Sequence, residues 1–320
     1  MAIAGTSSKK TADKPSYDMS PAIGTVEPTE PLDLGDLFEK KGTGIKRHAR
    51  NVLTVGKVGV GKTTAFSTIP QEIIDPDTGE LVPAKVLHID TDGKGNVIDR
   101  DKVPHFDFMR LPYDPANHLD TYKKLNALVY NLNNKVEGYA DYNIGILDGL
   151  TPIDLMLWEI SYLPPPVGVG THRIANDKNH TEYEIGIYDT DYTLGADKNY
   201  EFHKRAMGFL TFSLQNRFKY FFVTAHIKEP LYAAKKQEYA PDVHGSTKEL
   251  LPKLFHEVYY VVEHGVDAKA RPKWEWLTRA TGMYAARSCL PVTQYIPMDY
   301  SIITNGNWEK YRDDKPEAKE

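Results

Sequence analysis

The sequence contains only one cysteine, Cys289, among its 320 residues. A single thiol cannot form an internal disulfide, and it cannot supply a cluster of cysteine ligands for a metal ion. The chain also lacks any apolar run near the roughly 20 residues that cross a bilayer, and its N-terminus lacks the apolar core of a secretory signal. We therefore expect a soluble protein with no membrane partner, in a reducing cytoplasm.

An excess of basic charge is missing as well. Lys and Arg number 39 against 44 Asp and Glu, which gives a net charge of −5 at pH 7. A protein without a global positive field depends on local basic patches to bind nucleic acid. Residues 36–50 hold one such cluster, which either contacts a nucleic-acid backbone or forms an ordinary solvated surface.

The most informative stretch follows the apolar run at residues 52–55. Residues 56–64 read Gly-Lys-Val-Gly-Val-Gly-Lys-Thr-Thr, which fits the pattern G-x-x-x-x-G-K-T of a phosphate-binding loop. Glycines permit backbone dihedrals that turn successive N–H groups toward phosphate oxygens. The alternative is a glycine-rich surface turn, but the strand expected before it and the helix expected after it favour the phosphate loop. The predicted nucleotide contacts are Gly56, Gly59, Val60, Gly61, Lys62, Thr63 and Thr64.

Two residues of this loop have defined chemical roles. We expect Lys62 to place its ammonium on the terminal phosphates and the Thr63 hydroxyl to complete a Mg²⁺ shell. A helix that begins near Lys62 would add its positive N-terminal end, and Pro70 would stop this helix after Ile69. The predicted ligands are therefore a nucleotide and Mg²⁺.

Acidic residues end two further predicted buried strands. The strand at residues 85–90 leads into Asp92, and either Asp90 or Asp92 would orient a water molecule on the γ-phosphate. Ligands of open α/β sheets bind at the carboxyl ends of the strands. The strand at residues 143–148 ends in Asp148, which is predicted to hold Mg²⁺. Asp148 would alternatively cap the following helix, and one carboxylate can do both.

A histidine follows the next predicted strand, at residues 219–224, which leads into Thr224-Ala225-His226. His226 would sense the γ-phosphate and pass that state to the following loop, or it would serve as a structural histidine. Further along, residues 257–262 and 274–279 are predicted to form paired strands that extend the sheet in antiparallel fashion.

Composition divides the chain into three parts. Residues 1–35 are rich in proline and poor in apolar residues, which predicts a flexible arm. Residues 36–290 form the predicted α/β domain, with an insertion at about 164–195 where all periodicity is lost. Residues 291–320 are predicted to be a C-terminal extension with a frayed, charged end.

The order of these motifs resembles that of a known family. It is similar to the RecA-like P-loop nucleotide-binding proteins of tailed bacteriophages, an AAA-type ATP-binding group that includes single-strand annealing recombinases. The resemblance covers roughly residues 48–290 and implies a RecA-like fold, with a mainly parallel central sheet flanked by helices and an antiparallel C-terminal extension. The motifs that carry it are the phosphate loop, Ile89-Asp90-Thr91-Asp92, Ile146-Leu147-Asp148-Gly149-Leu150-Thr151, Thr224-Ala225-His226 and Ala240-Pro241-Asp242-Val243-His244-Gly245.

The resemblance also implies roles for individual residues. Asp148 would be the acid of the second nucleotide motif, and His226 would couple the nucleotide state to a DNA-binding loop. Asp92 stands where RecA-type ATPases usually place a catalytic glutamate. Because the side chain of aspartate is shorter, the resemblance leaves open whether ATP hydrolysis would be efficient. Arg279 and Arg287 would reach the nucleotide of a neighbouring subunit.

The function implied by the resemblance is that of an oligomeric ATPase. It would bind ATP and Mg²⁺, with Lys62, Asp92, Asp148 and His226 as its catalytic group. It would act on single-stranded DNA in phage recombination, annealing or replication, in the host cytoplasm. The residues leave two alternatives open, a nucleotide-binding assembly or scaffold module with little hydrolysis and a small-molecule kinase. The kinase is disfavoured because the insertion carries only Arg173, whereas a kinase lid usually has several arginines.

Overall fold

The structure is a computed structural model that describes residues 50–112, 114, 116, 118–162, 196–229, 238–266 and 269–313. The chain divides into two units, Met1–Lys46 and Arg47–Glu320, and all of these residues belong to the second. The predicted arm at 1–35, nearly all of the basic cluster at 36–50 and the insertion at 164–195 lie outside the described residues.

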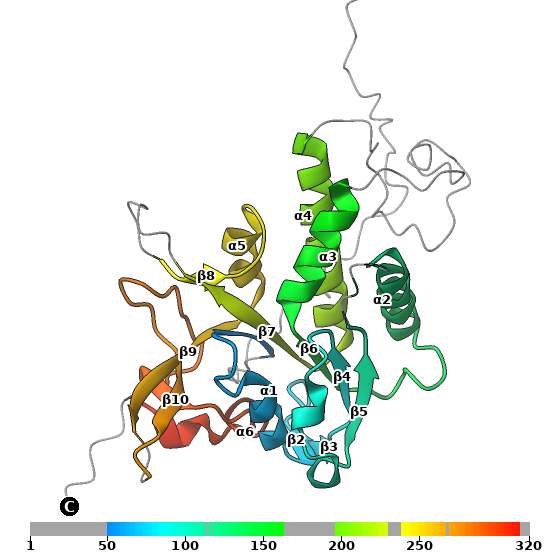
Figure 1. Cartoon of the computed structure of the whole chain (residues 1–320). Helices are drawn as coiled ribbons and strands as arrows, with labels where there is room; N and C mark the ends of the chain where they lie inside the picture. Colours follow the sequence, from blue (N-terminus) through cyan, green and yellow to red (C-terminus); the bar gives the residue numbers. More distant parts are fainter. Residues whose placement is uncertain are drawn as a thin grey trace, which may run out of the picture. The chain divides into compact units, whose positions relative to one another are not determined.

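A nine-stranded sheet forms the centre of the described part of the chain (Figure 1). Its strands are β1 (Asn51–Gly56), β4 (Val86–Asp90), β5 (Phe106–Arg110), β6 (Ile144–Asp148), β7 (Tyr220–Lys228), β8 (Ala240–Pro241), β9 (Glu257–Val266), β10 (Pro272–Leu277) and β11 (Tyr295–Pro297). The strand order is β11-β10-β9-β1-β7-β6-β4-β5, and β8 pairs with β7 off this path. A separate hairpin consists of β2 (Glu72–Ile74) and β3 (Leu81–Pro83).

Most of this sheet is parallel. The neighbouring strands from β9 through β1, β7, β6 and β4 to β5 all run in the same direction. At the β9 edge, β10 and then β11 continue the sheet in antiparallel fashion. The prediction of an α/β fold with a mainly parallel sheet and an antiparallel extension is thus confirmed. One detail was wrong, because Glu257–Val266 pairs parallel to β1 and the antiparallel part begins only at β10.

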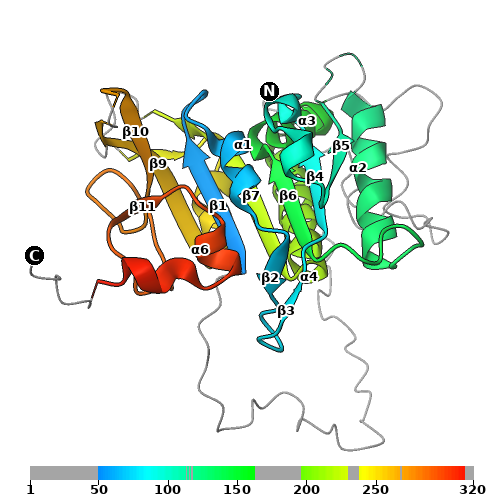
Figure 2. The same cartoon turned by 90° about the horizontal axis from the view of Figure 1, so that it is seen from below.

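Helices cover both faces of the sheet (Figure 2). They are α1 (Lys62–Ala65), α2 (His118–Asn133), α3 (Leu150–Tyr162), α4 (Ala196–Arg217), α5 (Thr247–Leu250) and α6 (Ser301–Thr304). Along β1, Leu53 and Val55 pack in a core with α2, α3 and α4, whereas Val52 packs on the other face with Phe66 and Ile302. Burial on both faces explains why these strands read as continuous apolar runs. No helix among the described residues is long and apolar enough to cross a membrane.

The helix after the phosphate loop is short. The α-helical part covers Lys62–Ala65, and a 3₁₀ turn at Phe66–Thr68 follows it before Pro70. The hydroxyls of Ser67 and Thr68 donate to the carbonyl oxygens of Thr64 and Ala65, three residues earlier in each case. Such side-chain bonds to the backbone compete with regular helical bonds and favour a tightened last turn. The predicted end before Pro70 is confirmed.

The segment at 291–313 contributes directly to the core. It supplies β11 and α6, and Val292, Ile296 and Tyr300 are fully or almost fully buried against the face that carries α1. The Tyr300 and Thr54 hydroxyls share a hydrogen bond of 3.1 Å, which joins this segment to β1. The strand that precedes the phosphate loop is therefore covered by residues more than 200 positions away in the sequence.

Candidate nucleotide-binding site

The phosphate loop connects β1 to α1 at the carboxyl edge of the parallel sheet (Figure 1). Gly59 and Gly61 have φ angles of 81° and 87°, in the left-handed region that residues with a Cβ avoid. Gly61 is also the residue from which α1 begins. Val60, between these two glycines, is buried in the core on the α1 face, whereas Thr64 is exposed. The loop therefore has the backbone geometry that its glycine spacing predicts.

Lys62 lies inside this loop and is only 8% exposed. Its Nζ donates to the carbonyl oxygens of Gly56 at 2.8 Å and of Lys57 at 2.7 Å. The ammonium is thus held by the backbone at the start of its own loop. The arrangement fits the role predicted for Lys62.

Charged neighbours surround the Lys62 ammonium. Burial disfavours the charged form and lowers the pKa of Lys62 to about 8. The carboxylates of Asp148 and Asp92 act in the opposite direction, and the ammonium of Lys94 adds to the lowering. Lys62, Asp148, Asp92 and Lys94 therefore share one electrostatic environment, although they come from separate parts of the chain.

Asp148 ends β6 and is 1% exposed. Its Oδ1 accepts a hydrogen bond of 2.5 Å from Thr224 Oγ1 on β7. Its Oδ2 lies 3.4 Å from His88 Nε2 and has no hydrogen-bond partner among the described residues. Burial by itself would raise the pKa of Asp148, but interactions with His88, Thr224 and Thr63 outweigh it and hold the pKa below its usual value. A buried carboxylate with one unsatisfied oxygen, next to the Thr63 hydroxyl, fits the oxygen ligands that Mg²⁺ prefers.

The capping alternative for Asp148 is not supported. Neither of its carboxylate oxygens accepts an N–H group of α3, which begins at Leu150. No cluster of three or more His, Cys, Asp or Glu side chains in the described part of the chain could hold a metal ion by itself. A Mg²⁺ ion at Thr63 and Asp148 would thus need the phosphates and water as its further ligands, as is usual in nucleotide sites.

The structure decides between Asp90 and Asp92. The Asp90 carboxylate turns into its own loop, where it accepts the N–H groups of Lys94 at 3.1 Å and Gly95 at 2.8 Å. Asp92 instead lies 3.4 Å from His226 Nε2 through its Oδ2, and both of its carboxylate oxygens lie close to Gly149. Asp92 is therefore the acid whose carboxylate lies beside His226 and Gly149, whereas the Asp90 carboxylate binds its own loop.

His226 connects three parts of the site. Its backbone N–H donates to Thr151 Oγ1 of α3 at 3.0 Å, and its carbonyl oxygen accepts the N–H of Asp242 at 2.8 Å. Its Nε2 is the atom near Asp92, while its buried Nδ1 has no hydrogen-bond partner in the described residues. These contacts suit a residue that links the nucleotide site to α3, and they equally suit a structural histidine, so its predicted role stays a prediction.

Thr91 joins the ends of β4 and β6. Its backbone N–H donates to the Asp148 carbonyl at 2.7 Å, and its hydroxyl accepts the Gly149 N–H at 2.8 Å and donates to the Gly149 carbonyl. In the parallel pairing of β4 with β6, Asp90 lies opposite Asp148. Thr91 thus holds the two acid-bearing turns together.

Sequence reasoning missed three residues that contact Asp148, namely His88, Thr91 and Thr224, and also Lys94, which lies near Asp92. His88 and Thr224 are polar residues inside otherwise apolar strands, and both are almost completely buried. Such positions usually need a partner, because an unpaired buried polar group is costly. That signal would have marked both residues as candidates, although it would not have identified Asp148 as their partner.

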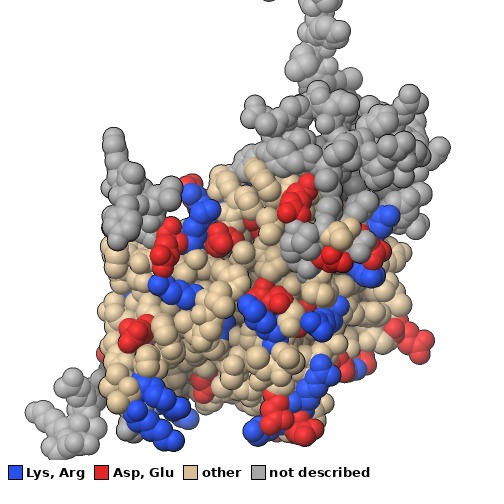
Figure 3. Space-filling view, in the orientation of Figure 1, with Lys and Arg blue, Asp and Glu red and all other residues tan. Residues whose placement is uncertain are grey.

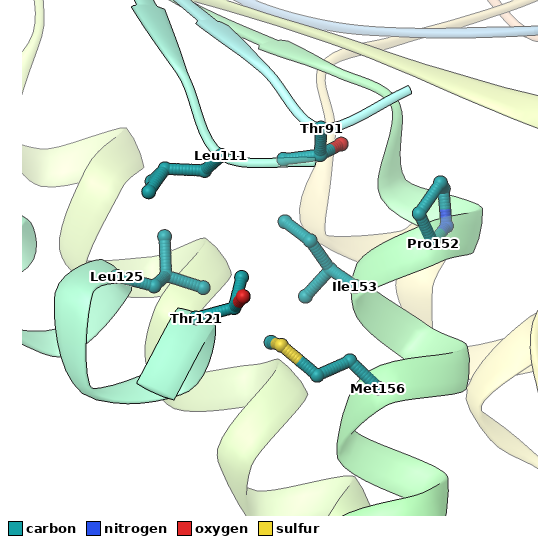
Figure 4. A pocket seen from close by; sticks show the side chains of 7 residues that line it. All are labelled: Thr91, Leu111, Thr121, Leu125, Pro152, Ile153 and Met156. Atoms are coloured by element: carbon teal, nitrogen blue, oxygen red, sulfur yellow. The ribbon is translucent and has the colours of Figure 1, made fainter. Parts of the chain in front are cut away.

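A small cavity lies beside Thr91, the residue that follows β4. The cavity in Figure 4 has a volume of about 10 Å³ and lies between the ends of Thr91 and Leu111 and apolar residues of α2 and α3. This volume is close to that of a single water molecule, so it cannot accept a substrate. Arg279 is bound to the Val292 carbonyl and to Asp313, and Arg287 is bound to the carbonyl oxygens of Pro252 and Phe255. Both arginines are thus engaged within their own chain.

No protein-family model matches this chain, and no curated protein is significantly similar to it. The interpretation of the site therefore depends on its motif and its geometry.

Proposed function

We propose that the protein is a RecA-like P-loop protein that binds ATP and Mg²⁺ and hydrolyses ATP. The observation that carries this proposal is the glycine loop after β1, which holds the buried Lys62 at the carboxyl edge of the parallel sheet, with Asp92 beside Gly149 and with Asp148 at the end of β6. Open α/β sheets bind their ligands at this edge. The fold class by itself would not support the proposal, because many functions share it.

Each residue has a role that follows from its chemistry. Lys62 binds the terminal phosphates through its ammonium, and the loop N–H groups orient them. Thr63 and Asp148 are the residues that would hold Mg²⁺, which neutralises phosphate charge when bound. Asp92 orients the attacking water and accepts its proton. His226, 3.4 Å from Asp92, is placed to respond to a change in that carboxylate.

We also propose that the protein acts on single-stranded DNA as a homo-oligomer, in phage recombination, annealing or replication. This part of the proposal is supported by the motif order. On the face shown in Figure 3, basic and acidic side chains are mixed. Contacts to DNA phosphates would therefore come from local groups of lysines and arginines.

The test is ATP binding and turnover by the full-length chain, with and without single-stranded DNA at low salt, where phosphate contacts are strongest. We expect ATP binding that needs Mg²⁺, and turnover that DNA increases. Electron microscopy with ATP and DNA should then show rings or filaments. A protein that binds no ATP overturns the whole proposal, and a protein that binds ATP but no DNA overturns its second part.

A second candidate function is a nucleotide-binding assembly or scaffold module with little hydrolysis. The observation that favours it is the position of Asp92 between His226 at 3.4 Å and Lys94 at 3.9 Å. Both neighbours lie beside the same carboxylate oxygen, Oδ2, where they compete with a water molecule for its hydrogen-bonding capacity. Tight ATP binding with negligible turnover, unchanged in Asp92→Ala, would favour this second function.

A further inference from the structure

The loop after β4 is held in a defined conformation. The buried Asp90 carboxylate accepts the N–H groups of Lys94 and Gly95, so both of its oxygens bind the loop backbone. A Cβ added to Gly95 would lie only 3.0 Å from Asp90 Oδ2, and Gly93 has a left-handed φ of 71°. These two glycines allow the chain to wrap around the carboxylate. The backbone of Lys94 is therefore anchored, whereas its side chain is 49% exposed.

The Lys94 side chain extends toward the nucleotide site. Its Nζ lies 3.9 Å from Asp92 Oδ2, which is too long for a hydrogen bond. Asp92 in turn lies beside Gly149, the residue that follows Asp148 at the end of β6. By contrast, Lys102 in the same segment pairs with Asp99 at 2.9 Å and is 78% exposed, as is ordinary for a surface lysine.

Two ammonium groups that share one site repel each other unless an anion lies between them. At this site the motif predicts a polyphosphate, and the two carboxylates nearby only balance the two lysines. The γ-phosphate carries negative charge that an additional cation can neutralise. A lysine is suited to this task, because its flexible four-carbon stem can move a compact charge by several ångströms.

We propose that Lys94 is a second phosphate-binding cation, which leaves Asp92 and contacts the γ-phosphate when a nucleoside triphosphate is bound. This inference rests on the proposed function and deepens it. The family resemblance implies that an arginine of a neighbouring subunit supplies a positive charge to the nucleotide. Lys94 would supply such a charge from within the same chain. The engagement of Arg279 and Arg287 with groups of their own chain agrees with this assignment. Movement of Lys94 would also release Asp92 to act on water.

The consequence is a preference for triphosphate over diphosphate. The loop N–H groups and Lys62 would hold phosphates of both nucleotides, and Lys62 would reach the γ-phosphate in addition, whereas Lys94 would contact the γ-phosphate alone. Loss of Lys94 should therefore weaken binding of the triphosphate selectively. A lysine that only stabilises the loop would affect both nucleotides equally.

Isothermal titration calorimetry on the full-length chain tests this, with Mg²⁺ and either ADP or a non-hydrolysable ATP analogue. We expect Lys94→Ala to weaken binding of the analogue about tenfold, as for the loss of one charge-assisted hydrogen bond, and to change ADP affinity less than about twofold. Lys94→Arg should retain most of the affinity for the analogue. The matched control Lys102→Ala should leave both affinities unchanged.

Two outcomes overturn the inference. Equal losses for both nucleotides in Lys94→Ala, or no loss for either, would show that Lys94 does not read the γ-phosphate. A wild type that binds neither nucleotide would instead overturn the proposed function and this inference together. Because Lys94 is half exposed, its variants should fold, which circular dichroism will check, and Lys94→Gln replaces the alanine variant if that one does not.

Discussion

Asp148 Oδ1 accepts a hydrogen bond of 2.5 Å from Thr224 Oγ1, and both residues are 1% exposed. The bond joins the carboxyl end of β6 to the middle of β7, its neighbour in the parallel sheet. It satisfies one carboxylate oxygen and leaves Oδ2 without a hydrogen-bond partner in the described part of the chain. Thr224 therefore orients the acid that would hold Mg²⁺, as outer residues around metal ligands commonly do.

We predict that Thr224→Val weakens both folding and Mg²⁺-dependent binding. Valine has the shape of threonine but removes the donor, so a buried anion loses a hydrogen bond worth about 1.5–3 kcal/mol. The free energy of unfolding in urea and the Mg²⁺ concentration needed for ATP binding measure the two effects.

Thr211→Val is the matched control for this variant. Thr211 is equally buried, but its hydroxyl has no hydrogen-bond partner among the described residues. Its replacement should be neutral or slightly stabilising. Equal destabilisation by both substitutions would contradict the role of the Thr224 bond.

Lys62→Met should separate binding from stability. Methionine keeps most of the apolar stem and removes an ammonium whose burial is unfavourable, as its lowered pKa of about 8 indicates. We expect the free energy of unfolding to change by no more than about 1 kcal/mol, because the lost bonds to two carbonyl oxygens offset the gain. ATP affinity should fall by about a hundredfold, in line with the loss of a charged contact in a partly desolvated site. A large loss of stability without loss of ATP affinity would contradict the assignment.

Asp92→Asn tests the catalytic role of this carboxylate. The amide has nearly the same size but cannot accept a proton, so we expect ATP turnover to fall by about a hundredfold or more. ATP affinity should change little, because Asp92 is not placed among the phosphate ligands. Asp99→Asn is the control, since Asp99 belongs to the following 3₁₀ turn and pairs with Lys102. Turnover that persists in Asp92→Asn would contradict the role of Asp92 as the base, whereas negligible turnover in the wild type as well would favour the assembly or scaffold function.

The pH dependence of stability should carry a contribution from His105. Burial lowers its pKa below 6.5, and a bond of 3.1 Å between its Nε2 and the Ile69 carbonyl only partly opposes this. Because the folded-state pKa is depressed, the unfolded state binds more protons just below pH 6.5. The contribution is therefore complete above pH 6.5 and is lost as the pH falls through the folded-state value.

Urea unfolding at pH 5, 6 and 7.5 will measure this effect. We expect His105→Gln, which cannot titrate, to lose less stability between pH 7.5 and 5 than the wild type does. Burial is also the main cause of the lowered pKa of His256. His256 is present in both proteins, so its effect on the pH dependence of stability cancels in the comparison. Identical pH profiles for the two proteins would rule out the contribution of His105.

Much of the site was predictable because its signals are local. The glycine spacing, Lys62 and Thr63 lie within nine residues, and their chemistry depends on the backbone of one turn. The strand ends at Asp90 and Asp148 were also visible, because buried parallel strands read as apolar runs that stop at polar residues. The direction of β9 was not predictable, because the pattern of an apolar strand does not specify the partner with which it pairs.

The phosphate loop and the set of acids available to it were determined by the sequence itself, through glycines that permit left-handed backbone and through polar residues at the ends of apolar runs. Only the tertiary structure decided which acid serves the site. Asp90 and Asp92 are two residues apart, and their assignment depends on how the chain turns around the Asp90 carboxylate and on the register that places β4 beside β6. The partners of Asp148 were decided in the same way, because His88 and Thr224 reach it across strands that are adjacent in space and distant in sequence.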